Sequence, residues 1–264
     1  MYAFEYQKPT SLAEAAKLGG GEEAKFVAGG MTLIPTLKQR LAKPSDLIDL
    51  GSIPELRGIK RDGNAIVIGA MTKHVEVADS DVVKGAIPAL AHLAELIGDP
   101  QVRNRGTLGG SIANNDPAAD YPAAVVGLGA TVVTNKRKIA AEAFFTGMFE
   151  TALAPDEIIT AVSFPIPERA GYEKFRNPAS RYAIVGVFVA KAAGGVRVAV
   201  TGAAPSVFRQ KDMEAALGKS FGADAVANVK QSATGLNADI HASAEYRAHL
   251  VTVMAKRAVQ KATG

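Results

Sequence analysis

The sequence predicts an α+β protein with two domains, and three observations favour this fold class. Strand and helix patterns alternate over residues 1–54, and strand-like runs dominate residues 55–168. Beyond Pro165 and Pro167, a β-hairpin precedes about sixty residues with helical patterns. We therefore expect one domain over residues 1–168, in two subdomains of about 1–54 and 55–168, and a second domain over residues 169–264.

The first fifty residues predict the order β-α-β-α-β. An alternating pattern at 4–8 and short apolar runs at 25–28 and 47–50 are typical of strands. Ser11 and Glu14 form a capping box that opens a helix ending at Leu18. A second helix is expected from Leu33 to Leu41, where Pro35 falls in the first turn and is tolerated. Helices between strands indicate a small parallel sheet.

The later segments predict further strands and a helical C-terminus. We expect strands at 65–68, 130–134 and 158–164, and a helical stretch at 81–96 that Pro88 interrupts. The polar, glycine-rich segment from Gly98 to Tyr121 is expected to be a long loop, a feature that is usually functional. The second domain should contain a hairpin (183–191 and 196–203) and a helical bundle (210–217, 224–234 and 244–261).

Composition excludes several classes of function. The chain has no cysteine, which rules out disulfides, thiolate zinc sites and thiolate-bound iron–sulfur clusters. Its four histidines are scattered, so we expect no metal site and no catalytic acid or base, and redox chemistry here would need an organic cofactor. The net charge of +4 comes without a Lys/Arg run, so nucleic-acid binding is not expected. No apolar stretch approaches the roughly twenty residues that span a bilayer, and no signal peptide is recognisable, so we expect a cytoplasmic protein.

Three glycine-containing segments are candidates for binding a ligand. Two of them follow predicted strands, and the third lies in the long polar segment. Ala28-Gly-Gly-Met-Thr32 lies between a strand and a helix, where successive N–H groups can bind a phosphate-sized anion. Ile34 breaks the GxGxxG pattern, which disfavours a Rossmann domain. Asn104 to Tyr121 offers glycines and short polar side chains suited to a nucleotide. For the first segment the alternative is an ordinary tight turn, and for the second a solvated loop. Gly69 to His74 alone favours a plain turn, with His74 at the surface or capping a helix.

These motifs together resemble a known family. Ala28–Pro35 followed by Arg103–Asn114 is similar to the medium, FAD-binding subunit of the xanthine dehydrogenase family, in the style of aerobic carbon monoxide dehydrogenases. Segments 117–122, 153–159 and 172–175 match it as well, so the resemblance covers essentially the whole chain. It implies a two-subdomain flavin domain of the vanillyl-alcohol-oxidase (PCMH) type followed by a small C-terminal domain.

The resemblance also implies a cofactor, partners and contact residues. FAD would be bound here, the molybdenum–pterin by a large partner subunit, and two [2Fe–2S] clusters by a small partner subunit. Electrons would pass from the clusters through FAD to NAD, a quinone or another acceptor, in a dimer of heterotrimers. The implied FAD contacts are Ala28, Gly29, Gly30, Met31, Thr32 and Leu33 in the pyrophosphate loop, Thr107, Gly109, Gly110, Ser111 and Asn114 in the second loop, and Asp120, Ile158, Ile159, Arg176 and Tyr182.

Neither the molybdenum–pterin nor the clusters would belong to this chain, and the absence of cysteine agrees with that division. Relatives often carry lysine where this chain has Arg176, whose planar guanidinium differs from a point charge. Two alternatives stay open from the sequence. One is a stand-alone flavin oxidase or reductase of the same fold, and the other is a non-catalytic nucleotide-binding scaffold.

Overall fold

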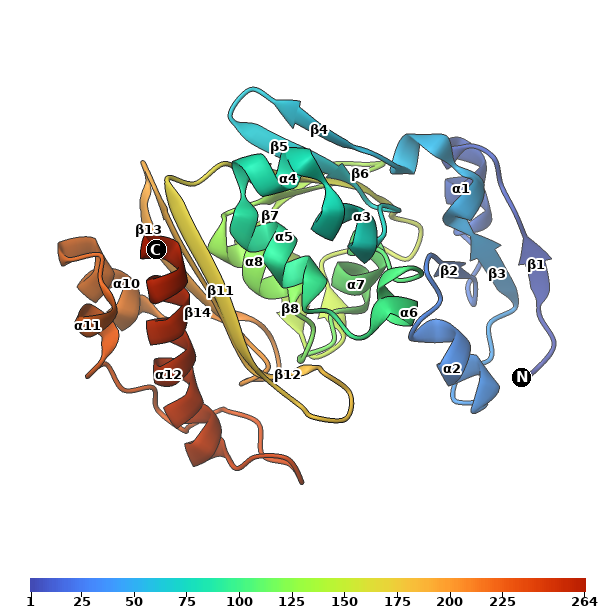
Figure 1. Ribbon diagram of the computed structural model, residues 1–264. Coiled ribbons are helices and arrows are strands. Elements are labelled where there is room, and N and C mark those ends of the chain that lie inside the picture. Colours follow the sequence, from blue (N-terminus) through green and yellow to red (C-terminus); the bar gives the residue numbers. More distant parts are fainter.

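The computed structural model describes residues 1–264, which form three units in chain order. In Figure 1 the N-terminal unit lies at the right, the C-terminal unit at the left, and the middle unit between them. No helix has both the length and the apolar composition needed to cross a membrane.

The N-terminal unit contains the small parallel sheet that the sequence predicts. Strand β3 lies between β1 and β2 and pairs with both in parallel. Ala15 and Ile48 are fully buried in its core. The elements are β1 (Glu5–Gln7), α1 (Leu12–Leu18), β2 (Lys25–Val27), α2 (Leu33–Lys38) and β3 (Asp46–Asp49), followed by two 3-10 turns at Leu50–Ser52 and Pro54–Leu56.

Two details of this unit differ from the predictions. The Ser11 hydroxyl caps α1 as expected, but the Glu14 carboxylate accepts from the N–H of Thr10 rather than of Ser11, so the capping box is incomplete. Helix α2 ends at Lys38 instead of Leu41, because Arg40 has a left-handed backbone with φ of 60°.

The middle unit is an antiparallel sheet with helices packed beside it. Its strand order is β4-β5-β10-β6-β7, and the predicted strands at 65–68, 130–134 and 158–164 all lie in it. Pro88 starts α5, as its position between two helical runs predicts. The elements are β4 (Ile59–Asp62), β5 (Ala65–Gly69), α3 (His74–Asp79), α4 (Asp81–Ala86), α5 (Pro88–Glu95), α6 (Pro100–Arg103), α7 (Leu108–Asn114), α8 (Tyr121–Gly127), β6 (Thr131–Thr134), β7 (Lys138–Ala140), α9 (Ala141–Phe144), β8 (Phe145–Gly147), β9 (Glu150–Thr151) and β10 (Ile159–Pro165).

The expectation of one long loop from Gly98 to Tyr121 is wrong. The segment contains α6 and α7: Asp99 and Thr107 cap the starts of these helices, and the glycine pair 109–110 lies within α7. The Asp99 carboxylate accepts from the N–H of Val102, and the Thr107 hydroxyl accepts from the N–H of Gly110. Polar residues at helix starts satisfy otherwise unpaired donors, so a polar composition does not exclude short helices.

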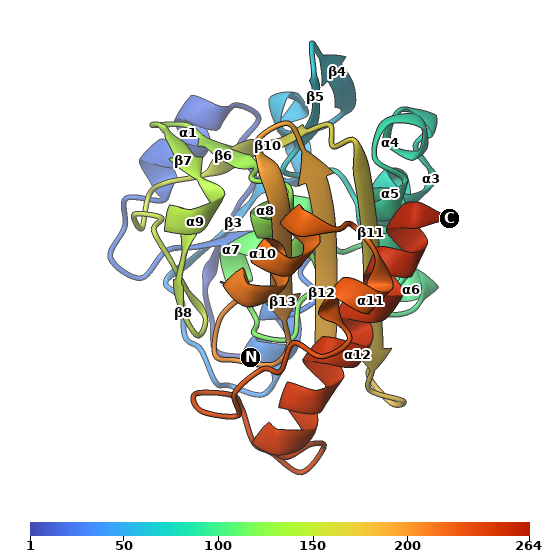
Figure 2. The ribbon, with the colours of Figure 1, turned by 90° about the vertical axis from the view of Figure 1, so that its left-hand side faces the viewer.

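The C-terminal unit is a four-stranded antiparallel sheet covered on both faces. Helices α5 and α8 of the middle unit contact one face, and α10 and α12 contact the other. Figure 2 shows α10, α11 and α12 in front of this sheet. Because both faces are covered, every residue from Ala183 to Ala190 is buried. The elements are β11 (Arg169–Arg176), β12 (Ala183–Ala192), β13 (Gly195–Thr201), β14 (Phe208–Arg209), α10 (Lys211–Lys219), α11 (Ala223–Val226) and α12 (Ala244–Thr263).

The predicted hairpin around Gly194 is confirmed as β12 and β13, but two features of this unit were not predicted correctly. Helix α11 ends at Val226 rather than Thr234, because the polar run Lys230–Ser232 offers no apolar face to bury. On α12, Leu250 and Met254 are buried as expected, whereas Tyr246 is exposed and Arg247 is buried instead.

Candidate functional site

The two glycine loops that lie about eighty residues apart in sequence are in contact. A Cβ atom added at Gly29 would lie 2.2 Å from the carbonyl oxygen of Arg105, and one added at Gly110 would lie 3.4 Å from the Cβ of Ala28. Only glycine permits so close an approach of one backbone to another. The structure therefore brings together the two segments that the sequence singled out.

The first loop presents a row of free backbone donors. The N–H groups of Gly29, Gly30, Met31 and Thr32 donate to no acceptor within the chain. Gly30 has φ of +74°, which turns the chain sharply between β2 and α2. Consecutive free N–H groups in such a turn form a concavity that binds an anion.

The third segment, Gly69–His74, is joined to the second loop. Its carbonyl oxygens accept from the N–H groups of Leu108 and Gly109, at 3.0 Å and 2.8 Å, and the His74 N–H donates to the Gly106 carbonyl. The segment is thus part of the framework that supports the second loop. Sequence reasoning favoured a plain turn here, because these partners lie more than thirty residues away.

The expectation that His74 lies at the surface or caps a helix is wrong, because His74, the first residue of α3 after the N-cap Lys73, is buried. Its side chain is buried, and its ring lies 5.4 Å from the Tyr121 ring. Burial, helped by the charge of Arg103, lowers the pKa of His74 to about 4, so the imidazole is neutral at pH 7. A neutral, enclosed histidine beneath the loop has a packing role.

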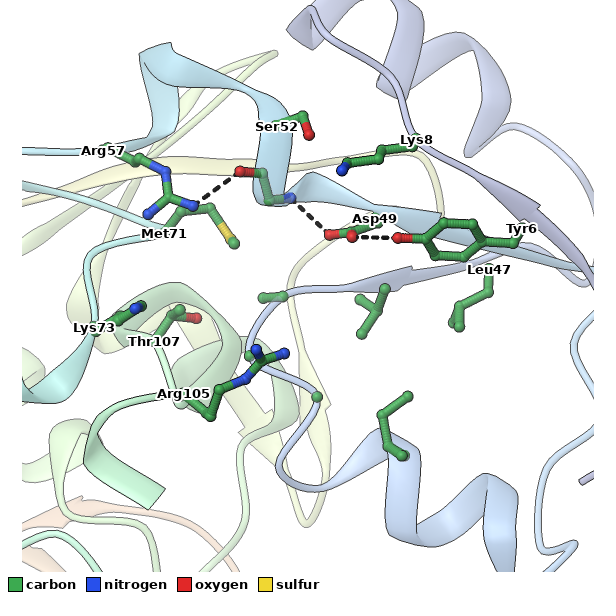
Figure 3. A pocket seen from close by; sticks show the side chains of 16 residues that line it. Tyr6, Lys8, Leu47, Asp49, Ser52, Arg57, Met71, Lys73, Arg105 and Thr107 are labelled. Carbon is green, nitrogen blue, oxygen red and sulfur yellow. Dashed lines mark hydrogen bonds between the residues drawn. The ribbon is translucent and has the colours of Figure 1, made fainter. Parts of the chain in front are cut away.

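A cavity of about 410 Å³ opens beside the two loops, between the N-terminal and middle units. Figure 3 shows Lys8, Arg57, Lys73 and Arg105 around it. The one carboxylate among its lining residues, Asp49, accepts from the Tyr6 hydroxyl and from the Gly51 N–H. Four cations and one engaged anion give the cavity a positive potential that suits an anionic ligand.

Sequence reasoning did not identify three of these cations. They stand on separate segments, with Lys8 and Arg57 outside any motif and Lys73 in the Gly69–His74 segment, so only the folded chain gathers them. Arg105 was noted because it precedes the second glycine loop.

Tyr182 lies on the turn between β11 and β12 and faces the first loop. Burial and the nearby carboxylates of Asp116 and Asp120 raise the pKa of Tyr182, while a hydrogen bond with the Thr32 side chain acts against that shift. Tyr182 is 44% exposed, so part of the residue is accessible to a ligand. An aromatic ring beside an anion-binding loop can cover a planar group.

The predicted contact residues of the two loops differ in how deeply they are buried. Thr107, the N-cap of α7, and Gly109 in the first turn of that helix are buried, and Gly110, Ser111 and Asn114 are partly buried on the same helix. Met31 and Thr32 are exposed, and Leu33 packs against the small cluster around Leu37.

Only four of the sixteen predicted contacts, Ala28, Gly29, Gly30 and Thr107, line this cavity. Ile158 is buried in the core of the N-terminal unit and Ile159 in the core of the middle unit. Arg176 is exposed at the end of β11 and has no carboxylate within ion-pair distance. Asp120 is buried and bonded to Tyr172 and Lys174.

Two family models match the sequence and together cover nearly all of it. Residues 2–167 match the FAD binding domain in molybdopterin dehydrogenase, and residues 170–262 match the CO dehydrogenase flavoprotein C-terminal domain.

Named relatives and solved structures agree with these matches. The chain is 37% identical to the carbon monoxide dehydrogenase medium chain of Hydrogenophaga pseudoflava, over 98% of this chain and 96% of that one. It is 36% identical to the nicotine 6-hydroxylase medium subunit of Paenarthrobacter nicotinovorans, over 98% and 97%. Among solved structures, the carbon monoxide dehydrogenase from Hydrogenophaga pseudoflava superposes with a TM-score of 0.88 at 38% identity, covering 99% of this chain and 98% of that chain. Quinoline 2-oxidoreductase from Pseudomonas putida 86 gives 0.89 at 29% identity, covering 99% and 97%.

Proposed function

The chain belongs to the family of FAD-binding medium subunits of molybdenum hydroxylases, and we propose that it carries electrons from the [2Fe–2S] clusters of a small partner subunit to an external acceptor. The large partner subunit would hold the molybdenum–pterin and oxidise the substrate. We further propose that these three chains assemble as a dimer of heterotrimers. The acceptor would be NAD, a quinone or another small oxidant that reaches the flavin.

The observation that carries this proposal is the contact between the two glycine loops. It places four free N–H donors beside a cationic cavity, and an FAD pyrophosphate needs such a cradle. A Cβ at Gly29 would fill the space where the loops meet. The residues present therefore fit an FAD dinucleotide.

The chain's own side chains would bind and orient the cofactor. Gly29–Thr32 would hold the pyrophosphate, the second loop would close around it, and the Tyr182 ring would cover the flavin. FAD, when bound, supplies the redox chemistry, because it accepts and releases electrons singly or in pairs. No histidine or carboxylate of the site is placed as a free acid or base, so the protein's part is positioning. The contacts of Ile158, Ile159 and Arg176 with FAD stay predictions, whereas the Asp120 carboxylate is bonded to Tyr172 and Lys174.

The domain boundary near residue 168 is also a proposal. Residues 166–168 connect the five-stranded sheet to the four-stranded sheet, since β10 ends at Pro165 and β11 begins at Arg169.

The direct test is to purify the chain from its native cells through an affinity tag and to identify what accompanies it. We expect a yellow-brown complex of three different chains that releases FAD on heating and contains iron and molybdenum. A complex without FAD would contradict the flavin assignment. FAD on a chain that purifies alone and oxidises a small substrate would instead support a stand-alone flavin enzyme.

Substitutions in the two loops should weaken FAD binding to different degrees. Gly110→Val adds bulk where even a Cβ would lie 2.9 Å from the Thr107 hydroxyl, so we expect a loss of affinity of about tenfold or more. Thr32→Ala removes one hydroxyl and should cost about two- to tenfold. FAD titration monitored by flavin fluorescence measures both. Unchanged affinity in the two variants would contradict the two-loop site.

A further inference from the structure

A buried ion pair links the middle unit to the turn that carries Tyr182. The Lys174 ammonium lies 2.9 Å from Asp120 Oδ1, and both side chains are almost fully buried. The Tyr172 hydroxyl also donates to Asp120 Oδ1, at 2.5 Å. Asp120 precedes α8, whereas Tyr172 and Lys174 lie on β11, so the pair joins the two domains that we propose.

The same lysine holds the backbone next to Tyr182. Lys174 Nζ donates to the carbonyl oxygen of Arg181 at 2.8 Å. Arg181 has a left-handed backbone, with φ of 63°, which a residue with a side chain adopts only where its surroundings impose it. The turn is closed at its base by Asn177, whose N–H donates to the Tyr182 carbonyl and whose carbonyl accepts from the Arg181 N–H.

Stability alone does not account for a buried pair of this kind. Replacing such a pair by apolar side chains of similar volume is often neutral or stabilising, because two charges no longer have to be desolvated. An apolar pair cannot bond to the Arg181 carbonyl, however. The contribution specific to Lys174 is therefore the position of the turn.

We infer that Lys174, itself oriented by Asp120 and Tyr172, is a positioning residue that sets Tyr182 at the flavin ring. This inference rests on the proposed function. It assigns Asp120 an action through Lys174 instead of a direct contact with the nucleotide. Both oxygens of its carboxylate already accept hydrogen bonds from the protein, since Lys174 also donates to Oδ2 at 3.1 Å.

The test compares FAD with ADP as ligands of the tagged complex after its flavin has been removed. ADP contains the pyrophosphate and adenosine but no flavin ring, so its binding does not depend on Tyr182. The double variant Asp120→Asn/Lys174→Met removes the carboxylate and the ammonium together, so that neither charge is left buried without its partner. We expect FAD affinity to fall about tenfold while ADP affinity stays within twofold.

A double-mutant cycle separates positioning from general damage. Tyr182→Ala alone should produce the same loss of FAD affinity, and adding Asp120→Asn/Lys174→Met to it should produce little further loss, because both act on one contact. If the first variant does not fold, Asp120→Asn/Lys174→Gln takes its place, since an amide pair stays hydrogen-bonded but glutamine is shorter than lysine.

A matched pair in the same domain serves as the control. Arg209 and the buried Glu214 form an ion pair at 2.7 Å and touch neither the Tyr182 turn nor Asp120. Arg209→Met/Glu214→Gln should change the melting temperature without changing the ratio of FAD to ADP affinity.

The outcomes distinguish this inference from the proposed function. An unchanged ratio in the Lys174 variant, or an equal loss of FAD and ADP affinity, would overturn the positioning role and leave the flavin assignment standing. A wild-type complex that binds neither ligand would overturn both.

Discussion

Gly29→Ala should separate the two loops and reduce FAD affinity by roughly one to two orders of magnitude. The added methyl group would lie 2.2 Å from the Arg105 carbonyl oxygen and 2.8 Å from the Gly106 Cα, and both are backbone atoms that no side-chain rotation can move. The loops can accept the methyl group only by moving apart. That movement takes the Gly29–Thr32 donors away from the second loop.

The measurement is a titration of the flavin-free complex with FAD, with Gly194→Ala as the control. Gly194 lies in the β12–β13 turn, and a Cβ there meets nothing within 4 Å. The control should bind FAD as the wild type does and should unfold at a similar temperature. Full FAD affinity in Gly29→Ala would show that the contact between the loops is not needed for the site.

Local patterns predicted much of this molecule from the sequence. The strands and helices of residues 1–50, the hairpin around Gly194 and the break at Pro88 each follow from patterns within a few residues, and the alternation of strand and helix predicts the parallel sheet. The first glycine loop could be predicted in the same way, because a pair of glycines after a strand indicates a sharp turn.

The features that the sequence did not predict depend on contacts between residues that are distant in sequence. Lys174 is a charged residue whose burial requires a carboxylate 54 positions away, and strand β11 around it has no clean alternation of polar and apolar residues. His74 was expected at the surface or as a helix cap, and its burial depends on Gly106 and Tyr121, which are distant in sequence. The same limit applies to the cavity, whose cations come from four separate segments.

Glu157 has a structural role that the sequence does not reveal. It lies in segment 153–159, which resembles the family sequence. Its carboxylate is almost fully buried and accepts from Arg137 Nε and Nη2, both at 3.0 Å, and from the Thr134 hydroxyl at 2.7 Å. It also accepts from the Ala154 N–H, which closes the segment leading into β10. These bonds, with Arg137 first, lower the pKa of Glu157 to about 2.

The lowered pKa predicts how acid should affect the fold. A carboxylate whose pKa is lower in the folded state stabilises that state above its unfolded pKa, near 4.5, and the contribution is lost as the pH falls toward 2. Because Arg137 is half exposed, solvent screening reduces the effect, and we expect about 1–2 kcal/mol at neutral pH. Glu157→Gln keeps the volume of the side chain but removes the charge that titrates.

Urea unfolding of the wild type and of Glu157→Gln, from neutral pH down to about pH 3, isolates this contribution as a difference between two curves. The wild type should be more stable at neutral pH, and the difference should shrink steadily below pH 4.5 while other carboxylates titrate equally in both proteins. If the difference in unfolding free energy between the two proteins stayed constant over this pH range, the charge of the Glu157 carboxylate would not contribute to stability. In that case a neutral side chain would be enough to hold the start of β10, because the glutamine carbonyl oxygen can still accept from the Ala154 N–H.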